Sequence, residues 1–208
     1  MCPRPSVEAE RRQQILAAAL TCFSRSGYHH TSMDDLAAEL PFSKGLLYYY
    51  FPTKRDLFVS LLDNWAEQSL QAWEAMLSPQ EEVVSQICKS IQYGVQLVAL
   101  SSDLARIEFE FYSEVGRDAQ VSEAFRTLYT QFRARIRSIL DAGVRSGDLR
   151  THDTEALAFV LFGAYEGLAL QALVEPDAVD WAAVSDSLCQ LVLHGLASEE
   201  KIHDRTQT

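Results

Sequence analysis

Three adjacent tyrosines stand between two lysines in the segment SKGLLYYYFPTK, residues 43–54. Phenol hydroxyls donate and accept hydrogen bonds, and ammonium groups pair with phosphates. Successive residues of a helix point about 100° apart, so one buried face cannot hide all three rings. If Leu47 and Phe51 form the inner face, Tyr49, Gly45 and Leu46 point outward. The segment therefore presents an aromatic and basic surface suited to nucleic-acid contacts.

A helix-turn-helix is the arrangement that would position this surface. Thr31 and Ser32 precede a short helical pattern and can cap its start, and Pro41 ends that pattern. After a short turn, Ser43 can cap the next helical pattern. Two short helices joined by a tight turn are typical of proteins whose second helix enters the major groove of DNA.

Motifs for catalysis or metal binding are scarce in the chain. It contains no Gly-rich phosphate loop, no Gly-x-Ser-x-Gly and only one Glu-x-x-His, at Glu200 and His203. A helical di-iron site needs a pair of such motifs. His29 and His30 are adjacent but have no other type of ligand beside them. We therefore expect a protein that is not an enzyme and that has no cofactor and no metal site.

The charge is unevenly distributed along the chain. Residues 1–55 hold seven Lys and Arg against five Asp and Glu, a balance of +2, and residues 56–208 hold eleven against 24, a balance of −13. DNA is a polyanion, so residues 1–55 are the part of the chain better suited to bind it. No apolar stretch approaches the roughly 18 residues that cross a bilayer. We expect two domains, residues 1–55 and 56–208, in a cytoplasmic protein without membrane contacts.

Apolar residues recur at helical spacing along the whole chain, with no strand-like alternation. The patterns predict about nine helices, over residues 8–26, 33–40, 44–51, 54–77, 81–100, 103–115, 121–145, 154–174 and 181–196. The expected fold class is all-α, with three helices in the first domain. The four cysteines lack C-x-x-C spacing, which predicts free thiols in a reducing compartment.

The segment ILAAALTCFSRSGYHHTSMDDLAAELPFSKGLLYYYFPTKRDLF closely resembles the N-terminal domain of the TetR family of bacterial transcriptional regulators. The match covers about residues 11–62 and includes the Ser-Lys-Gly-x-Leu-Tyr-Tyr-Tyr-Phe recognition helix. Two positions depart from the family pattern: Pro41 replaces a usual glycine in the turn, and Leu46 a usual threonine that contacts a base. The resemblance implies DNA contacts from Ser32, Ser43, Lys44, Gly45, Leu46, Tyr48, Tyr49, Tyr50 and Lys54.

The resemblance also implies that the middle helices enclose an effector pocket. Glu108 and Glu110 interleave with aromatic residues there, which favours a cationic or amphipathic ligand through charge pairing and cation–π contact. The alternatives are that the aromatic rings are core and that the carboxylates are solvated on a helix face. The expected ligand-binding residues are Tyr93, Glu108, Phe109, Tyr112, Phe125, Tyr129 and Phe132.

The last two helical segments are apolar on more than one side and need a cover beyond their own domain. Residues 154–174 are interrupted only by Glu155, Glu166 and Gln171. A second copy of the chain is an economical cover, because a two-fold dimer pairs a surface with itself. The expected dimer-interface residues are Phe159, Gly163, Gly167, Leu170, Leu188 and Leu191.

These observations predict a homodimeric transcriptional repressor that binds a palindromic operator in double-stranded DNA and is released by a small-molecule effector. The alternative is a small-molecule-binding or scaffold helical dimer without specific DNA binding. DNA affinities measured over a series of salt concentrations would separate the two.

Overall fold

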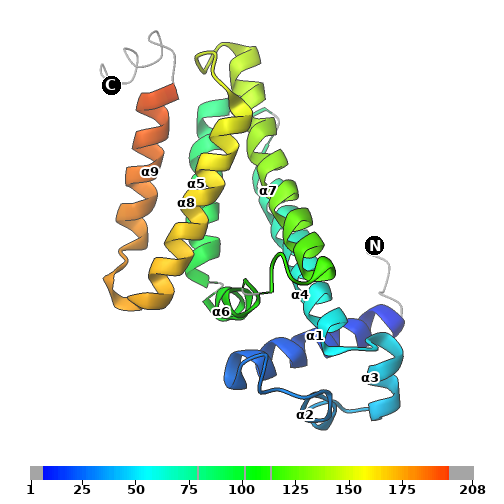
Figure 1. Cartoon of the computed structure of the whole chain (residues 1–208). Helices are drawn as coiled ribbons and strands as arrows, with labels where there is room; N and C mark the ends of the chain where they lie inside the picture. The colour runs from blue at the N-terminus through cyan, green and yellow to red at the C-terminus, as the bar shows by residue number, and fades with distance from the viewer. Residues whose placement is uncertain (1–6, 79, 101, 113, 197–208) are drawn as a thin grey trace. The chain divides into compact units, whose positions relative to one another are not determined.

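The computed structural model of the chain describes residues 7–78, 80–100, 102–112 and 114–196. Within these ranges it contains nine α-helices, one short 3-10 helix and no strand (Figure 1), which confirms the all-α class. In chain order the elements are α1 (Val7–Ser26), α2 (Met33–Ala38), α3 (Lys44–Tyr50), α4 (Lys54–Met76), α5 (Val83–Leu100), α6 (Ser102–Phe111), α7 (Ala119–Ser146), α8 (Thr154–Val174), η1 (Pro176–Ala178) and α9 (Trp181–Leu196). Helices α2 and α6 end earlier than the sequence pattern predicts.

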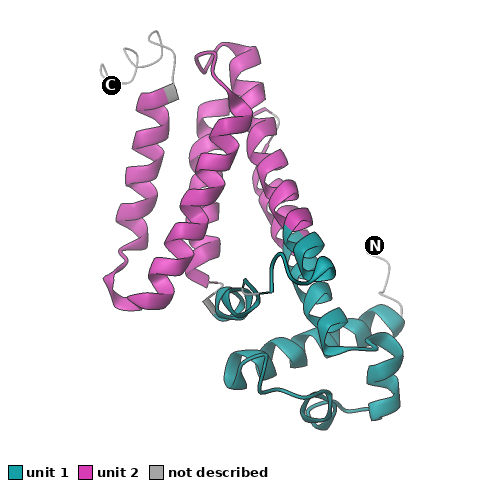
Figure 2. Ribbon diagram, in the orientation of Figure 1, with its two compact units in different colours: residues 1–66, 103–125 teal, residues 67–102, 126–208 magenta. Residues whose placement is uncertain are grey.

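Two compact units divide the chain (Figure 2). Unit 1 comprises residues 1–66 and 103–125, and unit 2 comprises residues 67–102 and 126–208. Both α4 and α7 therefore begin in unit 1 and end in unit 2. The units differ from a division at residue 55, because nearly all of α6 and the start of α7 group with the N-terminal helices. The functional division into residues 1–55 and 56–208 stays a prediction.

The N-terminal helices of unit 1 form for the local reasons that their sequences indicate. The buried stripe of α1 consists of Ile15, Leu16, Ala19, Cys22 and Phe23. After this helix, Gly27 has a φ of +79°, in the left-handed region that favours glycine. Ser32 and Asp35 form a capping box at the start of α2. On the inner side of α3, Leu47 and Phe51 are both buried, as predicted.

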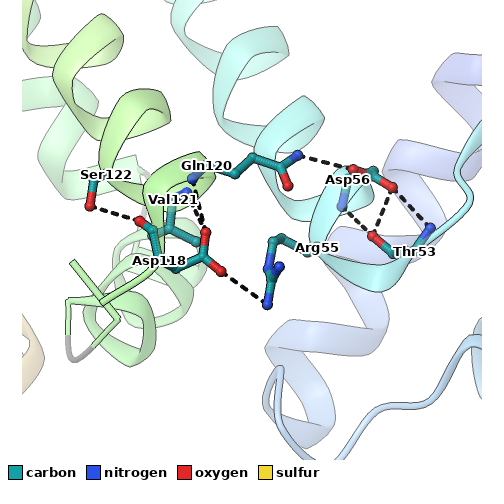
Figure 3. A network of polar contacts seen from close by, with 7 residues as sticks. All are labelled: Thr53, Arg55, Asp56, Asp118, Gln120, Val121 and Ser122. Carbon is teal, nitrogen blue, oxygen red and sulfur yellow. Dashed lines mark hydrogen bonds and ion pairs between the residues drawn. The ribbon is translucent and has the colours of Figure 1, made fainter. Parts of the chain in front are cut away.

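A network of polar contacts joins the start of α4 to the start of α7 (Figure 3). Asp56 accepts hydrogen bonds from the backbone N–H of Thr53 at 3.0 Å and from the Gln120 amide at 3.0 Å. Arg55 pairs with Asp118 at 3.0 Å. Asp118 also accepts the backbone N–H of Gln120 at 2.9 Å, in the first turn of α7. The first turns of the two long helices are thus held together within unit 1.

Unit 2 is a bundle of α5, α8, α9 and the C-terminal parts of α4 and α7. Helix α5 pairs with both α8 and α9. Gly94 permits the close approach of α8, because a Cβ at this position would lie 2.7 Å from the ring of Tyr165. The buried residues of α5, spaced along one side of the helix, are Val84, Ile87, Ile91 and Val95.

The cysteine prediction is wrong for one pair. Cys88 of α5 and Cys189 of α9 form a disulfide, with their Cα atoms 5.6 Å apart. These residues are separated by 101 positions in the sequence, so local spacing could not reveal that they meet. Cys22 is a free, buried cysteine.

Helix α8 corrects a second expectation. It has 21 residues and a mean hydropathy of 1.7 over its most apolar window, which by length and composition suffices to cross a membrane. Two contacts make it part of the unit 2 bundle: Tyr165 packs against Gly94, and Glu166 accepts a hydrogen bond from Tyr129 at 2.9 Å. Only 11% of that window is buried, so much of its apolar surface lies bare on a single chain.

Candidate functional site

The outer side of α3 carries the residues expected to enter the major groove. The Tyr49 side chain is 75% exposed. A Cβ at Gly45 would meet only the Ser43 hydroxyl, at 3.9 Å, so the backbone there is open to an approaching group. Lys44 is exposed at the start of the same helix. The predicted outward orientation of Tyr49 and Gly45 is confirmed, and their contact with DNA stays a prediction.

Three other expected contacts border this side of α3. Tyr48 is 39% exposed, and Tyr50 is half-buried with its ring 5.3 Å from that of Tyr49 in a T-shaped arrangement. Leu46 is half-buried, although helical geometry predicts that it faces outward. Its exposed part can still offer an apolar surface next to Tyr49 and Tyr50.

The two expected serine contacts lie at helix starts. The Ser32 hydroxyl donates to the Asp35 carboxylate at 2.6 Å and accepts the Asp35 backbone N–H at 3.1 Å. These hydrogen bonds from Ser32 hold the pKa of Asp35 below its usual range. Ser43 occupies the N-cap position of α3, but its side chain makes no capping hydrogen bond. The predicted N-cap position of Ser43 is therefore confirmed, without a hydrogen bond from its side chain.

An ion pair joins α3 to α2. Lys44 Nζ lies 2.5 Å from Asp34 Oδ1 and 5.7 Å from the centroid of the Tyr48 ring. The hydrogen bond with Asp34 raises the pKa of Lys44. A phosphate that binds Lys44 must therefore compete with the carboxylate of Asp34.

Lys54, expected to contact phosphate, has a structural role that its sequence position does not reveal. Its Nζ donates to the backbone carbonyls of Tyr28 at 2.6 Å and Thr31 at 2.8 Å. Nζ also lies 4.1 Å from the centroid of the Tyr28 ring. Burial lowers the pKa of this half-buried ammonium. Two of its three N–H groups are thus used inside unit 1, where they tie the start of α4 to the turn between α1 and α2.

Helix α6 reaches the same turn. Glu110 accepts the backbone N–H of Tyr28 at 2.8 Å. The ring of Phe111 lies 4.2 Å from the Tyr28 ring and 3.3 Å from the Phe58 ring of α4, with which it is stacked. Tyr28 is therefore a meeting point of α1, α4 and α6. Glu110, which the sequence groups with Glu108 as a hint of a cationic ligand, is bound to this turn.

The expected effector residues divide between the units. Phe109, Tyr112 and Phe125 belong to unit 1, where the Tyr112 ring lies 5.0 Å from that of Phe109 and 5.1 Å from that of Phe125. Glu108 is half-buried on α6 in the same unit. The remaining three, Tyr93, Tyr129 and Phe132, belong to unit 2. Their role as ligand contacts stays a prediction in both units.

In unit 2 the expected residues join an aromatic cluster with members that the sequence analysis missed: Trp73, Phe162 and Glu166. The Trp73 ring lies 6.1 Å from Tyr93 and 6.5 Å from Phe132. Phe162 lies 5.9 Å from Phe132 and 5.0 Å from Tyr129, whose hydroxyl donates to Glu166. Phe162 and Glu166 are one helical turn apart, and Glu166 is the only charged residue of α8 beyond its first turn; this spacing is the signal that could have identified them.

Hydrogen bonds fix two rings of this cluster. The Trp73 indole N–H donates to the Ser90 hydroxyl at 2.9 Å, and the Tyr93 hydroxyl donates to the Ser69 carbonyl at 2.7 Å. Burial raises the pKa of Tyr93. The Arg135 guanidinium lies 5.9 Å from the Trp73 ring centroid, and the carboxylate of the cluster is that of Glu166, bound by the Tyr129 hydroxyl.

The expected dimer residues lie on bare surface of α8 and α9. Phe159, Leu170 and Leu191 are 54%, 48% and 71% exposed. A Cβ at Gly163 or Gly167 would meet nothing within 4 Å. An open, largely apolar groove of about 1050 Å³ is lined by α8, η1 and α9, including Gly167, Leu170, Leu188 and Leu191. A partner for this surface stays a prediction.

Within the described residues, no group of three or more His, Cys, Asp and Glu side chains is arranged to hold a metal ion. Glu200 and His203 lie outside the described residues.

Comparisons with known proteins match both parts of the chain. Residues 15–61 match the family model of bacterial regulatory proteins of the tetR family, and residues 95–197 match that of the BetI-type transcriptional repressor C-terminal domain. An uncharacterized HTH-type transcriptional regulator of Bacillus subtilis, YfiR, is 24% identical over 97% of this chain and 100% of its own length.

Solved structures share the fold. A transcriptional regulator from Saccharomonospora viridis in complex with choline has a TM-score of 0.79 at 21% identity, covering 92% of this chain and 100% of that one. The regulator FadR from Bacillus subtilis in complex with stearoyl-CoA has a TM-score of 0.74 at 20% identity, covering 88% of this chain and 98% of that one.

Proposed function

Because the chain belongs to the TetR family of bacterial transcriptional regulators, we propose that it is a repressor that binds a palindromic operator as a homodimer and releases it when a small molecule binds. The observation that carries this proposal is the outer side of α3, where Tyr49, Gly45 and Lys44 are exposed. An aromatic ring and a lysine on the second helix of a helix-turn-helix suit a base edge and a phosphate.

Tyr49→Ala tests this proposal on an operator selected from random DNA. A base contact is worth about 1–3 kcal/mol, so the variant is expected to bind the operator about 5–150-fold more weakly. The melting temperature should be unchanged, because the ring is 75% exposed. Met76→Ala, which shortens an exposed side chain of α4 in unit 2, is the control and should bind normally. Unchanged affinity in Tyr49→Ala would refute the assignment of α3 as the reading helix.

The dimer part of the proposal rests on the apolar surface of α8 and α9. Glycines at 163 and 167 let a facing helix approach closely, and exposed Phe159 and Leu191 supply apolar area. Gly163→Arg should place a charge in this surface and halve the mass seen in sedimentation. Gln131→Arg adds the same side chain at an exposed position of α7 and should remain dimeric. A Gly163→Arg variant that is still dimeric would move the interface elsewhere.

For the effector, the unit 2 cluster favours an organic cation. Aromatic faces and a carboxylate together attract a cation that has few hydrogen-bond donors, through cation–π and charge pairing. Tyr129, Phe162 and Glu166 supply these groups at one place. The choline complex of the Saccharomonospora viridis regulator supports the same ligand class.

Calorimetry with choline and its uncharged isostere 3,3-dimethylbutan-1-ol tests the ligand class. Choline should bind and the isostere should not, because only the cation gains from Glu166. Glu166→Gln should abolish the preference, and Glu155→Gln, an exposed carboxylate on the same helix, should retain it. Equal binding of the two probes would refute a cation site, and tight binding of an acyl-CoA instead would favour the ligand class of the FadR complex.

In a dimer, the two copies of α3 must enter major grooves about 34–36 Å apart, or a multiple of that spacing. The effector can release DNA only if it binds more tightly to an arrangement of the two α3 helices that does not match this spacing. Helix α4 is continuous from Lys54 in unit 1 to Met76 in unit 2 and is our candidate for carrying the change. A coupling of about 1–3 kcal/mol would weaken operator binding about 5–150-fold. By linkage, operator DNA should weaken effector binding by the same factor, which titrations with and without DNA can measure.

A further inference from the structure

The pair Cys88 and Cys189 links α5 to α9. Their Cα atoms are 5.6 Å apart, within the range of about 4.4–6.8 Å that a disulfide requires. Both side chains are half-buried, so a small oxidant can reach them. Cys22, in contrast, is buried in unit 1, and burial raises the pKa of its thiol, which disfavours the reactive thiolate.

The position of Cys189 on α9 gives the bond a mechanical role. Ser185 and Val192 are buried, and they lie four residues before and three residues after Cys189, so all three share one side of the helix. Leu191 is 71% exposed and belongs to the surface assigned above to the dimer. A bond at Cys189 therefore fixes to α5 the helix that carries part of the dimer surface.

We propose that Cys88 and Cys189 are a reversible oxidation site, closed by hydroperoxides or low-molecular-weight disulfides, and that closure holds α9 in the position that favours the dimer. The structure shows the closed, oxidised form. A regulator that acts on DNA works where thiols are kept reduced, so the dithiol is the form expected before oxidation. The reduced starting form and the effect on the dimer rest on the proposed function, whereas the formation of the bond is independent of it.

The reaction is balanced with a hydroperoxide as the oxidant. One thiolate attacks the peroxide, which gives a sulfenic acid and an alcohol, and the second thiol displaces water from the sulfenic sulfur. The two thiols lose two electrons and two protons in total, and the peroxide O–O bond is reduced to one alcohol and one water. With a low-molecular-weight disulfide, two successive exchange steps release two small thiols.

Bond formation is tested on the full-length protein equilibrated at increasing ratios of glutathione disulfide to glutathione. The free thiols are then alkylated and counted from the intact mass. Wild type and Cys22→Ser should each lose two alkylatable thiols together, whereas Cys88→Ser and Cys189→Ser should form no intramolecular bond. The oxidised wild type should melt roughly 4–16 °C above the reduced form, since a disulfide stabilises by constraining the unfolded chain. Cys88 and Cys189 thiols that stay alkylatable at fully oxidising ratios would overturn the oxidation site, and equal melting temperatures would overturn the constraint that the bond places on α9. Because this comparison uses one wild-type protein in two states, it does not depend on the folding of a variant.

Sedimentation of the same two samples tests the effect on assembly. The dimer of the reduced protein should have a several-fold higher dissociation constant than that of the oxidised protein. Cys88→Ser should have the dissociation constant of the reduced protein under both conditions. A bond that forms while the dimer constants stay equal would overturn the link to assembly. A bond that forms in a protein that is monomeric throughout would instead refute the homodimer of the proposed function and leave the oxidation site standing.

Discussion

Lys54 Nζ donates to the Tyr28 carbonyl at 2.6 Å while lying 4.1 Å from the centroid of the Tyr28 ring. One side chain at the start of α4 thus contacts both the backbone and the ring of Tyr28, two residues after α1 ends. The ammonium is half-buried. If it were removed, the Thr31 carbonyl would lose its partner, whereas the Tyr28 carbonyl would keep the Thr31 backbone N–H at 3.2 Å.

Lys54→Met should therefore lower the free energy of unfolding by about 2 kcal/mol, because a buried polar group that loses its partner costs about 1–3 kcal/mol. Arg55→Met removes the ion pair between exposed Arg55 and half-buried Asp118 one residue away, and should cost about 1 kcal/mol. Urea unfolding measures both. Full stability in Lys54→Met, combined with weaker DNA binding, would mean that phosphate contact is the main role of Lys54.

Asp34→Asn should strengthen operator binding by a few fold. The substitution frees Lys44 from its ion pair and removes a negative charge beside α3. Glu39→Gln is the matched control: it also removes one charge from unit 1, but its partner is Arg25 of α1. Affinities at two salt concentrations separate the specific effect of freeing Lys44 from the change in net charge. An equal gain in both variants would show that net charge alone is responsible.

Gly27→Ala should destabilise the protein more than Gly116→Ala. Both glycines have positive φ, +79° and +84°, where alanine is strained by roughly 1–2 kcal/mol. A Cβ at Gly27 would in addition lie 3.1 Å from Glu110 Oε1, whereas nothing lies within 4 Å of a Cβ at Gly116. The difference between the two free energies of unfolding therefore reports on the contact between α6 and Tyr28. Equal losses would show that Glu110 moves aside without cost.

Acid should weaken the junction of α4 and α7. Hydrogen bonds from the Gln120 amide and from Thr53 lower the pKa of Asp56 below its usual 3.8. The unfolded state then binds the proton more readily, so this contribution is complete above the usual pKa and is lost as the pH falls through the lower, folded value. Asp56→Asn should reduce the slope of unfolding free energy against pH below about pH 4. Gln120→Ala, which removes the largest cause, should reduce it partly, and an unchanged slope in both variants would contradict the assignment.

Local geometry was enough to predict much of the surface of α3. The 100° step places Tyr49 opposite Leu47, and these side chains are indeed exposed and buried. Contacts made over long sequence distances were not predictable in this way. Glu110 meets Tyr28 across 82 positions, and Cys88 meets Cys189 across 101. Nor could residue type show that Lys54 binds two carbonyls inside the protein, because a lysine at the start of a helix is equally typical of a phosphate contact.

The discontinuous course of unit 1 bears on how this protein can be rebuilt. Its first segment ends at residue 66, but Phe111 of α6 stacks on Phe58, and Phe125 of α7 lies 6.4 Å from the same ring. A chimera that grafts residues 1–66 onto a foreign sensor would leave Phe58 and Tyr28 without these neighbours and would lose the carboxylate of Glu110. The N-terminal DNA-binding helices therefore do not form a self-contained module. We expect a chimera to keep their packing only if it also contains residues 103–125, so an exchange between relatives has to preserve two separate stretches of chain.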